Sequence, residues 1–138
     1  MSRRKFIKKT VLGSIGSSSL GLAFKNPDFK NFSGPRIIST WNHGFEANKV
    51  AWNNLKSGKG GLTAVEYGVR VSEDDPDEMS VGLGGLPDRT GKVTLDACIM
   101  DSNNDCGSVS FLQNIKNPIS VARLVMEKTP HIMLSGKG

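Results

Sequence analysis

The chain has 138 residues, which is enough for one modest domain, and its formal net charge is +5. Seven of its 18 lysines and arginines lie in residues 1–33 with a single acidic residue, Asp28, whereas the rest of the chain is close to neutral. A near-neutral domain lacks the positive surface that binds phosphate backbones, so the charge distribution argues against a nucleic-acid partner.

The basic N-terminus is typical of an export signal. A moderately apolar stretch, residues 10–24, follows the basic residues and is too short and too polar to span a membrane as an ordinary helix. Residues 2–8, SRRKFIK, resemble the twin-arginine signal, with Arg3 and Arg4 as the arginine pair. We therefore expect residues 1–33 to be a signal peptide and linker, the twin-arginine export machinery to be a partner, and the protein to be periplasmic. A basic helix start or a disordered tail is the alternative.

Helices and strands are expected to alternate along the remaining domain. A proline followed by β-branched residues predicts a first strand over residues 36–41. Apolar residues at helical spacing predict one helix over residues 45–58 and a second over residues 62–75, which Pro76 ends.

The second half of the domain reads as a hairpin, a helix and a strand. Residues 92–100 and 106–112 flank five residues of turn chemistry, DSNND, and carry apolar residues on both sides, so we expect a β-hairpin buried on two faces. A third helix is expected over residues 117–128, with Asn117 as its N-cap and Pro118 in its first turn. Residues 131–135 are expected to form the last strand.

Gly82, Gly84 and Gly85 raise the question of a phosphate-binding loop. Their spacing matches neither the dinucleotide-binding nor the P-loop pattern, and a strand rather than a helix is expected after them. The cluster instead predicts a backbone crossing that needs a positive φ or a close approach.

The remaining polar residues give no strong metal or redox signal. Cys98 and Cys106 lie on opposite arms of the expected hairpin, nearly across from one another; free thiols are expected, with a disulfide as the alternative in an oxidising compartment. His43 and His131 lack zinc-ligand spacing relative to the cysteines. The loop with Asp74, Asp75, Asp77 and Glu78 is expected to be solvated and to contain Asx turns, and cation binding by these carboxylates is the alternative. No metal and no cofactor are expected.

Four segments together resemble the N-terminal half of the glycosylasparaginases. They are residues 39–44 (STWNHG), 73–101, 107–109 and 115–134. The longest segment carries the pattern DPxExSVGxGGxPDxxGxVxLDAxIMD with fixed spacing. The resemblance covers nearly everything from Ile37 to Gly138.

The resemblance implies an α+β fold, in which residues 34–138 form the α-subunit part, a truncated half, of a four-layer αββα N-terminal nucleophile hydrolase sandwich. Precursors of this family cut themselves before a threonine in a His-Asp-Thr sequence. The new N-terminal threonine then attacks the side-chain amide of a glycosylated asparagine and uses its own α-amine as base. The reaction cleaves the amide between N-acetylglucosamine and asparagine.

No threonine of this chain stands in a His-Asp-Thr context. The nucleophile and the β-subunit that carries it are therefore expected beyond Gly138, and the chain alone is expected to be inactive. Half of such a sandwich would expose apolar strand faces, so residues 34–138 alone are expected to be insoluble or molten. The alternatives are a non-catalytic remnant or binding module that retains the half-fold, or a related L-asparaginase.

Three residues of this chain are expected to bind the substrate. By resemblance, Trp41 matches the active-site tryptophan that walls the substrate pocket, and Ser80 matches a serine that faces the active site. His43 stands where the family commonly has phenylalanine, which makes the pocket wall titratable. Two further departures are Thr63 in place of a usual aspartate and Lys137 in GKG, where the family tends to have GDG.

Overall fold

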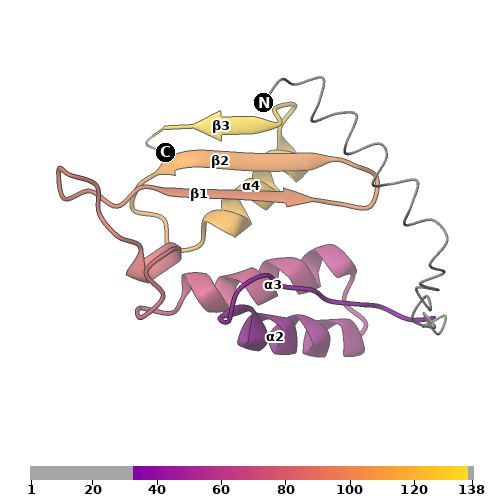
Figure 1. Cartoon of the computed structure of the whole chain (residues 1–138). Helices are drawn as coiled ribbons and strands as arrows, with labels where there is room; N and C mark the ends of the chain where they lie inside the picture. The colour runs from indigo at the N-terminus through magenta and orange to yellow at the C-terminus, as the bar shows by residue number, and fades with distance from the viewer. Residues whose placement is uncertain (1–32, 137–138) are drawn as a thin grey trace, which may run out of the picture. The chain divides into compact units, whose positions relative to one another are not determined.

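Residues 36–136 build three α-helices and one three-stranded sheet. The computed structural model describes residues 33–136, so the expected export signal with Arg3 and Arg4, and also Lys137, lie outside the described residues. The elements in chain order are α2 (Gly44–Lys56), α3 (Gly61–Glu73), the short 3₁₀-helix η1 (Gly82–Gly84), β1 (Leu95–Met100), β2 (Cys106–Leu112), α4 (Pro118–Lys128) and β3 (Met133–Ser135) (Figure 1). None of the helices in the described part of the chain is long and apolar enough to cross a membrane.

The three strands form one sheet with β2 in the middle. β1 pairs with β2 antiparallel, as the expected hairpin requires, and β3 pairs with β2 parallel after the chain has passed through α4. The tight turn between β1 and β2 is closed by a hydrogen bond from the Asp101 N–H to the Asp105 carbonyl, 2.9 Å long. α4 lies against one face of the sheet (Figure 1) and forms the main core with it; the buried members of that core are Ile99, Val109, Leu112, Ile119, Ala122 and Val125.

The sheet is buried on one face only, which corrects the expectation of burial on both. In β1, Ile99 is buried and Ala97 is half-buried on the side of α4, whereas Asp96, Cys98 and Met100 are exposed. This alternation is the pattern of a strand with one covered face.

A β-bulge in β2 explains why that strand carries apolar residues at both alternating positions. Val109 and Leu112 are both buried although they stand three residues apart, a spacing that would put them on opposite faces of a regular strand. Between them Phe111 has a φ of 58°, and the pairing register shifts between Leu95 and Ala97. The extra residue turns Leu112 back toward α4. The Phe111 N–H donates to Asp96 Oδ1 at 2.9 Å, which satisfies the backbone group that the bulge leaves without a strand partner.

α2 and α3 pack against each other, and both helices were expected from the sequence. Ala51 and Ala64 are buried between them. Gly68 of α3 lies so close to α2 that a Cβ atom there would stand 2.9 Å from the Ala47 carbonyl oxygen, so the small residue permits the close approach of the helices. α3 is tied to α4 by an ion pair of 2.8 Å between Glu66 and Arg123.

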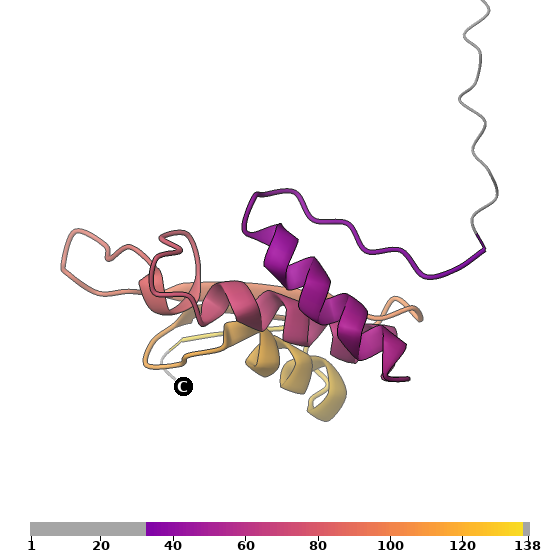
Figure 2. The ribbon, with the colours of Figure 1, turned by 90° about the horizontal axis from the view of Figure 1, so that it is seen from below.

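The expected strand over residues 36–41 is wrong. The segment is extended but pairs with no strand of the described chain, and it runs as a plain stretch up to the start of α2 (Figure 2). Residues 36–39 lie against α2 and α3, and the Ser39 hydroxyl donates to Asn48 Oδ1 of α2 at 2.5 Å. Ile38 is 89% exposed. β-branched residues favour extended backbone, but a strand also needs a neighbour to bond with.

Candidate functional site

The three residues expected to bind substrate line one hollow of about 660 Å³. Its walls are residues 41–43 from the turn before α2, residues 77–80 from the acidic loop after α3, and Leu86. We call it the Trp41–Ser80 hollow. The two segments are far apart in sequence, so the fold brings Trp41, His43 and Ser80 together. Trp41 is 76% exposed, which makes the hollow an open one.

A tight turn positions Trp41 and His43 at the start of α2. The Gly44 N–H donates to the Trp41 carbonyl at 2.9 Å. Gly44 is buried, and a Cβ there would lie 2.2 Å from the Cβ of Ser39, so the close approach needs a glycine. The His43 side chain points to α3 rather than capping its own helix. Its Nδ1 is hydrogen-bonded to the hydroxyl of the buried Ser72 at 2.9 Å. α3 therefore fixes the orientation of the imidazole.

Ser80 is held by the carboxylate of Glu78. Glu78 Oε1 accepts the Ser80 N–H at 3.1 Å and also accepts the Ser80 hydroxyl. The surrounding loop is closed by a hydrogen bond from the Leu86 N–H to the Met79 carbonyl, 3.2 Å long. The hydrogen bonds from Ser80 lower the pKa of the Glu78 carboxyl, and the nearby charge of His43 lowers it further. Glu78 is thus an anion at neutral pH.

The glycine cluster docks this loop on α3, as a backbone crossing should. Gly82 has a φ of +57°, and a Cβ there would lie 2.1 Å from the Glu73 carbonyl oxygen. At Gly84 a Cβ would lie 2.5 Å from the carbonyl oxygens of both Pro76 and Glu78. Gly82 lets the backbone pass against the end of α3, and Gly84 lets it pass against Pro76 and Glu78 of the acidic loop. The next regular element is strand β1.

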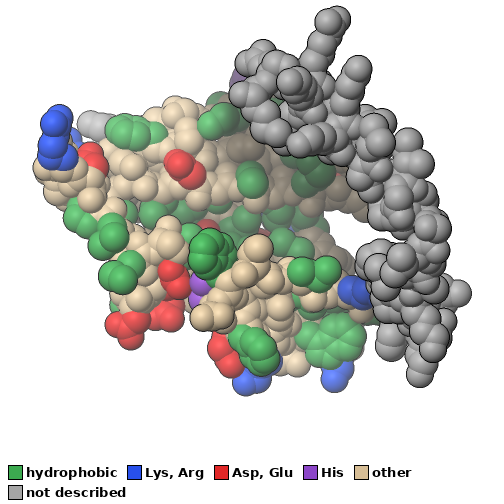
Figure 3. Space-filling model, in the orientation of Figure 1, with side chains coloured by type: hydrophobic (Ala, Val, Ile, Leu, Met, Phe, Trp, Pro, Cys, Tyr) green, Lys and Arg blue, Asp and Glu red, His purple; other side chains and the backbone are tan. Residues whose placement is uncertain are grey.

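Acidic side chains gather near the hollow. In the space-filling view, Asp and Glu side chains cluster at one end of the α2–α3 layer, and a histidine side chain is visible beside them (Figure 3). Asp75 forms the expected Asx turn, in which its Oδ1 accepts the Asp77 N–H at 2.9 Å. Within residues 33–136, no three His, Cys, Asp or Glu side chains are close enough together to hold a metal ion.

The sequence analysis misses a buried carboxylate at the junction of α3 and α4. Glu73 is 3% exposed at the end of α3, and its Oε1 accepts the Ile119 N–H of α4 at 2.9 Å. Burial raises the pKa of Glu73, while the hydrogen bonds from Ile119 and Asn117 act against that rise.

Asn117 stands at the N-cap position of α4, as expected, but its side chain does not play the capping role. Its side chain makes no capping bond and donates instead to Asp74 Oδ1 at 2.8 Å and to Glu73 Oε2 at 3.3 Å. Glu73 caps α4 in its place. Pro118 does occupy the first turn, as expected.

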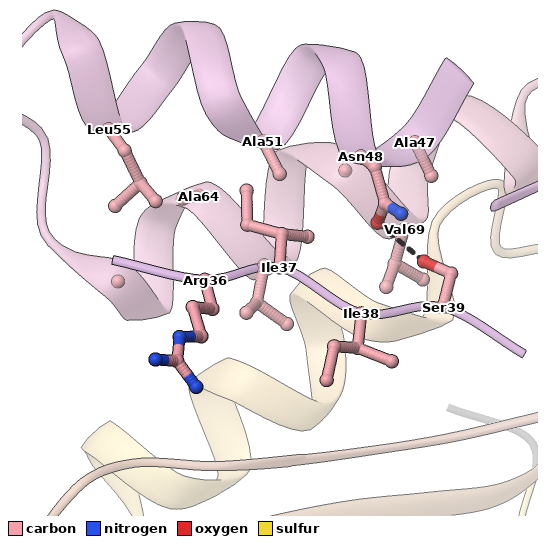
Figure 4. Close-up of a pocket in the computed structure, with 13 residues that line it drawn as sticks. Arg36, Ile37, Ile38, Ser39, Ala47, Asn48, Ala51, Leu55, Ala64 and Val69 are labelled. Atoms are coloured by element: carbon pink, nitrogen blue, oxygen red, sulfur yellow. Dashed lines mark hydrogen bonds between the residues drawn. The ribbon is translucent and has the colours of Figure 1, made fainter. Parts of the chain in front are cut away.

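A second hollow of about 250 Å³ lies between residues 36–39 and the helices α2 and α3 (Figure 4). Ile37, Ala51, Leu55, Ala64 and Val69 give it a largely apolar lining. It contains none of the residues that the sequence predicts for the site.

The cysteines are both free thiols. They are not opposite one another, because Cys98 pairs with Ser108 and Cys106 pairs with Met100 in the hairpin register. Cys98 is exposed and Cys106 is half-buried.

Comparison with known proteins identifies the family. A family model described as "Asparaginase" matches residues 39–138. The chain belongs to this asparaginase family. Within it, the chain is 54% identical over 141 aligned residues to the "N(4)-(Beta-N-acetylglucosaminyl)-L-asparaginase" of Elizabethkingia miricola, an alignment that covers 99% of this chain and 42% of that protein.

Animal relatives are more distant. The "N(4)-(beta-N-acetylglucosaminyl)-L-asparaginase" of Mus musculus is 46% identical over 103 residues, which are 74% of this chain and 30% of the relative. A "Putative N(4)-(beta-N-acetylglucosaminyl)-L-asparaginase" of Drosophila grimshawi is 45% identical over 75% of this chain and 27% of its own length. The resemblance to glycosylasparaginases is thus confirmed, and the chain spans less than half the length of each of these relatives.

Proposed function

We propose that this chain is the N-terminal portion of an amidohydrolase that cleaves the amide between N-acetylglucosamine and asparagine. The relatives carry the name of this activity, and the chain spans 42% of the bacterial relative and 27 to 30% of the two animal ones. The family reaction uses an N-terminal threonine as nucleophile, and no threonine of this chain has the His-Asp-Thr context. The chain therefore contributes substrate-binding walls rather than the nucleophile.

One observation carries the proposal for the site. Trp41, His43 and Ser80, the residues that the family resemblance assigns to the substrate pocket, lie around a single hollow of about 660 Å³, a size suited to a small-molecule ligand. The Trp41 indole offers a large flat apolar surface and one N–H donor, which suits a sugar ring or the carbon chain of an asparagine.

Two further features complete the proposal. The exposed face of the β1–β2–β3 sheet is where a second sheet, supplied by a β-subunit after autocatalytic cleavage, would form the four-layer αββα sandwich. The basic residues with Arg3 and Arg4 direct export by the twin-arginine route, and residues 34–138 begin the mature domain, so the enzyme works in the periplasm.

The test is an assay of the protein expressed from its complete native gene. It is incubated with N4-(β-N-acetylglucosaminyl)-L-asparagine and, separately, with L-asparagine, and released aspartate is measured. Faster release from the glycosylated substrate, together with cleavage into two fragments on a denaturing gel, is the expected result. Equal or faster release from free asparagine would make the protein an L-asparaginase.

The alternative function is a non-catalytic binding module. In that case the native-gene product would bind the glycosylated amide, seen as a change in tryptophan fluorescence, without releasing aspartate. Absence of both turnover and binding contradicts both functions.

A further inference from the structure

The wall of the Trp41–Ser80 hollow contains a contact that the family resemblance does not assign. Glu78 Oε1 accepts both the backbone N–H and the hydroxyl of Ser80, and both residues line the hollow. Glu78 is half-buried whereas Ser80 is exposed. One carboxylate oxygen therefore fixes both the backbone and the side chain of the serine.

This contact determines whether the Ser80 hydroxyl can donate a hydrogen bond to a ligand or accept one from it. A serine hydroxyl has one proton to donate and two lone pairs to accept with, whereas an ionised carboxylate only accepts. The hydroxyl proton of Ser80 is committed to Glu78, so the lone pairs of its oxygen remain for the ligand. Ser80 meets a ligand as an acceptor.

The charges around the hollow also favour a ligand group that donates a hydrogen bond. Its lining residues include two carboxylates, Asp77 and Glu78, and His43 is the one lining side chain that can become a cation. An acceptor beside two carboxylates favours a ligand group that donates, such as an amide N–H or an ammonium group, over a carboxylate.

We propose that Glu78 is a positioning residue that holds Ser80 as a hydrogen-bond acceptor for a donor group of the substrate. This role rests on the proposed function of the hollow. In this role Glu78 acts on the substrate through Ser80.

A double-mutant cycle in the native-gene product tests the proposal. Hydrolysis of the glycosylated asparagine is measured for wild type, Glu78→Ala, Ser80→Ala and the double variant. Glu78→Ala is expected to lower kcat/KM about tenfold, the size expected for one charge-assisted hydrogen bond. In the Ser80→Ala background the same change is expected to have no further effect, because the serine through which Glu78 acts is gone.

Two further variants distinguish the positioning of Ser80 by Glu78 from an effect of the Glu78 charge or of misfolding. Glu78→Gln keeps a carbonyl oxygen that can accept from Ser80 and is expected to restore most of the loss. Asp77→Asn removes a neighbouring charge that makes no contact with Ser80, and its effect is expected to be the same with and without Ser80. If Glu78→Ala lowers kcat/KM as much in the Ser80→Ala background as in the wild type, Glu78 acts through its charge or through the stability of the fold, and the proposal is overturned.

The proposal can fail independently of the proposed function. If the wild-type protein hydrolyses no substrate, the proposed function fails, and the contact is judged by NMR titration of the Glu78 carboxyl. A rise in its pKa on Ser80→Ala supports the contact, and an unchanged pKa overturns it.

Discussion

The carboxylate of Glu73, at the end of α3, accepts a hydrogen bond from the backbone N–H of Ile119, at the start of α4, with a donor–acceptor distance of 2.9 Å. The N-terminus of a helix leaves N–H groups without partners and carries a partial positive charge, so an anion placed there stabilises it. Two helices far apart in sequence are thereby joined at one buried carboxylate.

Replacing Glu73 should test this cap. Glu73→Ala leaves a buried N–H without an acceptor and is expected to destabilise the fold by about 1–3 kcal/mol. Glu73→Gln keeps a carbonyl oxygen for Ile119, and because burial raises the pKa of Glu73, the loss of its charge should cost less. Thermal or urea unfolding compares the two variants. Glu46→Ala, an exposed carboxylate on α2, is the control and should change little.

Two glycines with positive φ should respond differently to alanine. Gly82→Ala combines a left-handed backbone with a Cβ that would lie 2.1 Å from the Glu73 carbonyl oxygen, so we expect a loss of several kcal/mol, on the order of 3 or more. Gly91 has a φ of +82° and open space around it, so Gly91→Ala should cost only the backbone strain, about 1 kcal/mol. Equal losses in unfolding experiments would show that the crossing at Gly82 is not tightly packed.

The α3–α4 ion pair should make stability sensitive to acid. Burial raises the pKa of Glu66, but the hydrogen bonds from Ser120 and Arg123 and the charge of Arg123 outweigh it, so its folded-state pKa lies below the ordinary value. Its stabilising contribution is therefore present above the ordinary carboxyl pKa and is lost as the pH falls through the lower folded-state pKa. Arg123→Leu should weaken this acid dependence of the melting temperature. An unchanged pH profile would exclude the Glu66–Arg123 contact as the source of the acid dependence.

His43→Phe tests the link between the hollow and α3. The substitution removes the partner of the buried Ser72 hydroxyl, and the expected loss of stability is about 1–2 kcal/mol. Adding Ser72→Ala should restore part of it, because no buried hydroxyl then lacks a partner. If the double variant is no more stable than His43→Phe alone, the hydrogen bond is not the cause of the loss.

Cys98 can report whether the exposed sheet face is covered in the complete protein. The thiol is free and exposed on that face. With Cys106→Ser as background, a maleimide should label Cys98 slowly in the native-gene product if a second sheet covers it, and rapidly after denaturation. Rapid labelling of the folded protein would argue against the four-layer arrangement.

Local patterns in the sequence predict most of the regular elements. The helical spacing of Ala47, Ala51 and Leu55 identifies α2, and the turn residues after Met100 identify the hairpin. The strand expected at residues 36–41 fails because pairing depends on a neighbour that the local sequence does not specify. The bulge at Phe111 is missed for a related reason, since a bulge is defined by the register of two strands.

The substrate-binding role of the three residues stays a prediction. Trp41, His43 and Ser80 were identified by family resemblance, and the fold brings them to one hollow. Glu73 was missed because its partner Ile119 is 46 positions away, and a carboxylate at the end of a helix gives no local sign of where its acceptor oxygens will point.

The packing of Gly82 on Glu73 also bears on how the protein opens locally. The loop that carries Ser80 rests on the backbone of Glu73, and the side chain of Glu73 caps α4. We therefore expect lifting of the loop to disturb the start of that helix. We expect the amides of Leu86 and Ile119 to exchange with solvent as parts of one cooperative unit, with similar protection. The rim of the hollow would then be as rigid as a helix end, and a ligand would find it already formed.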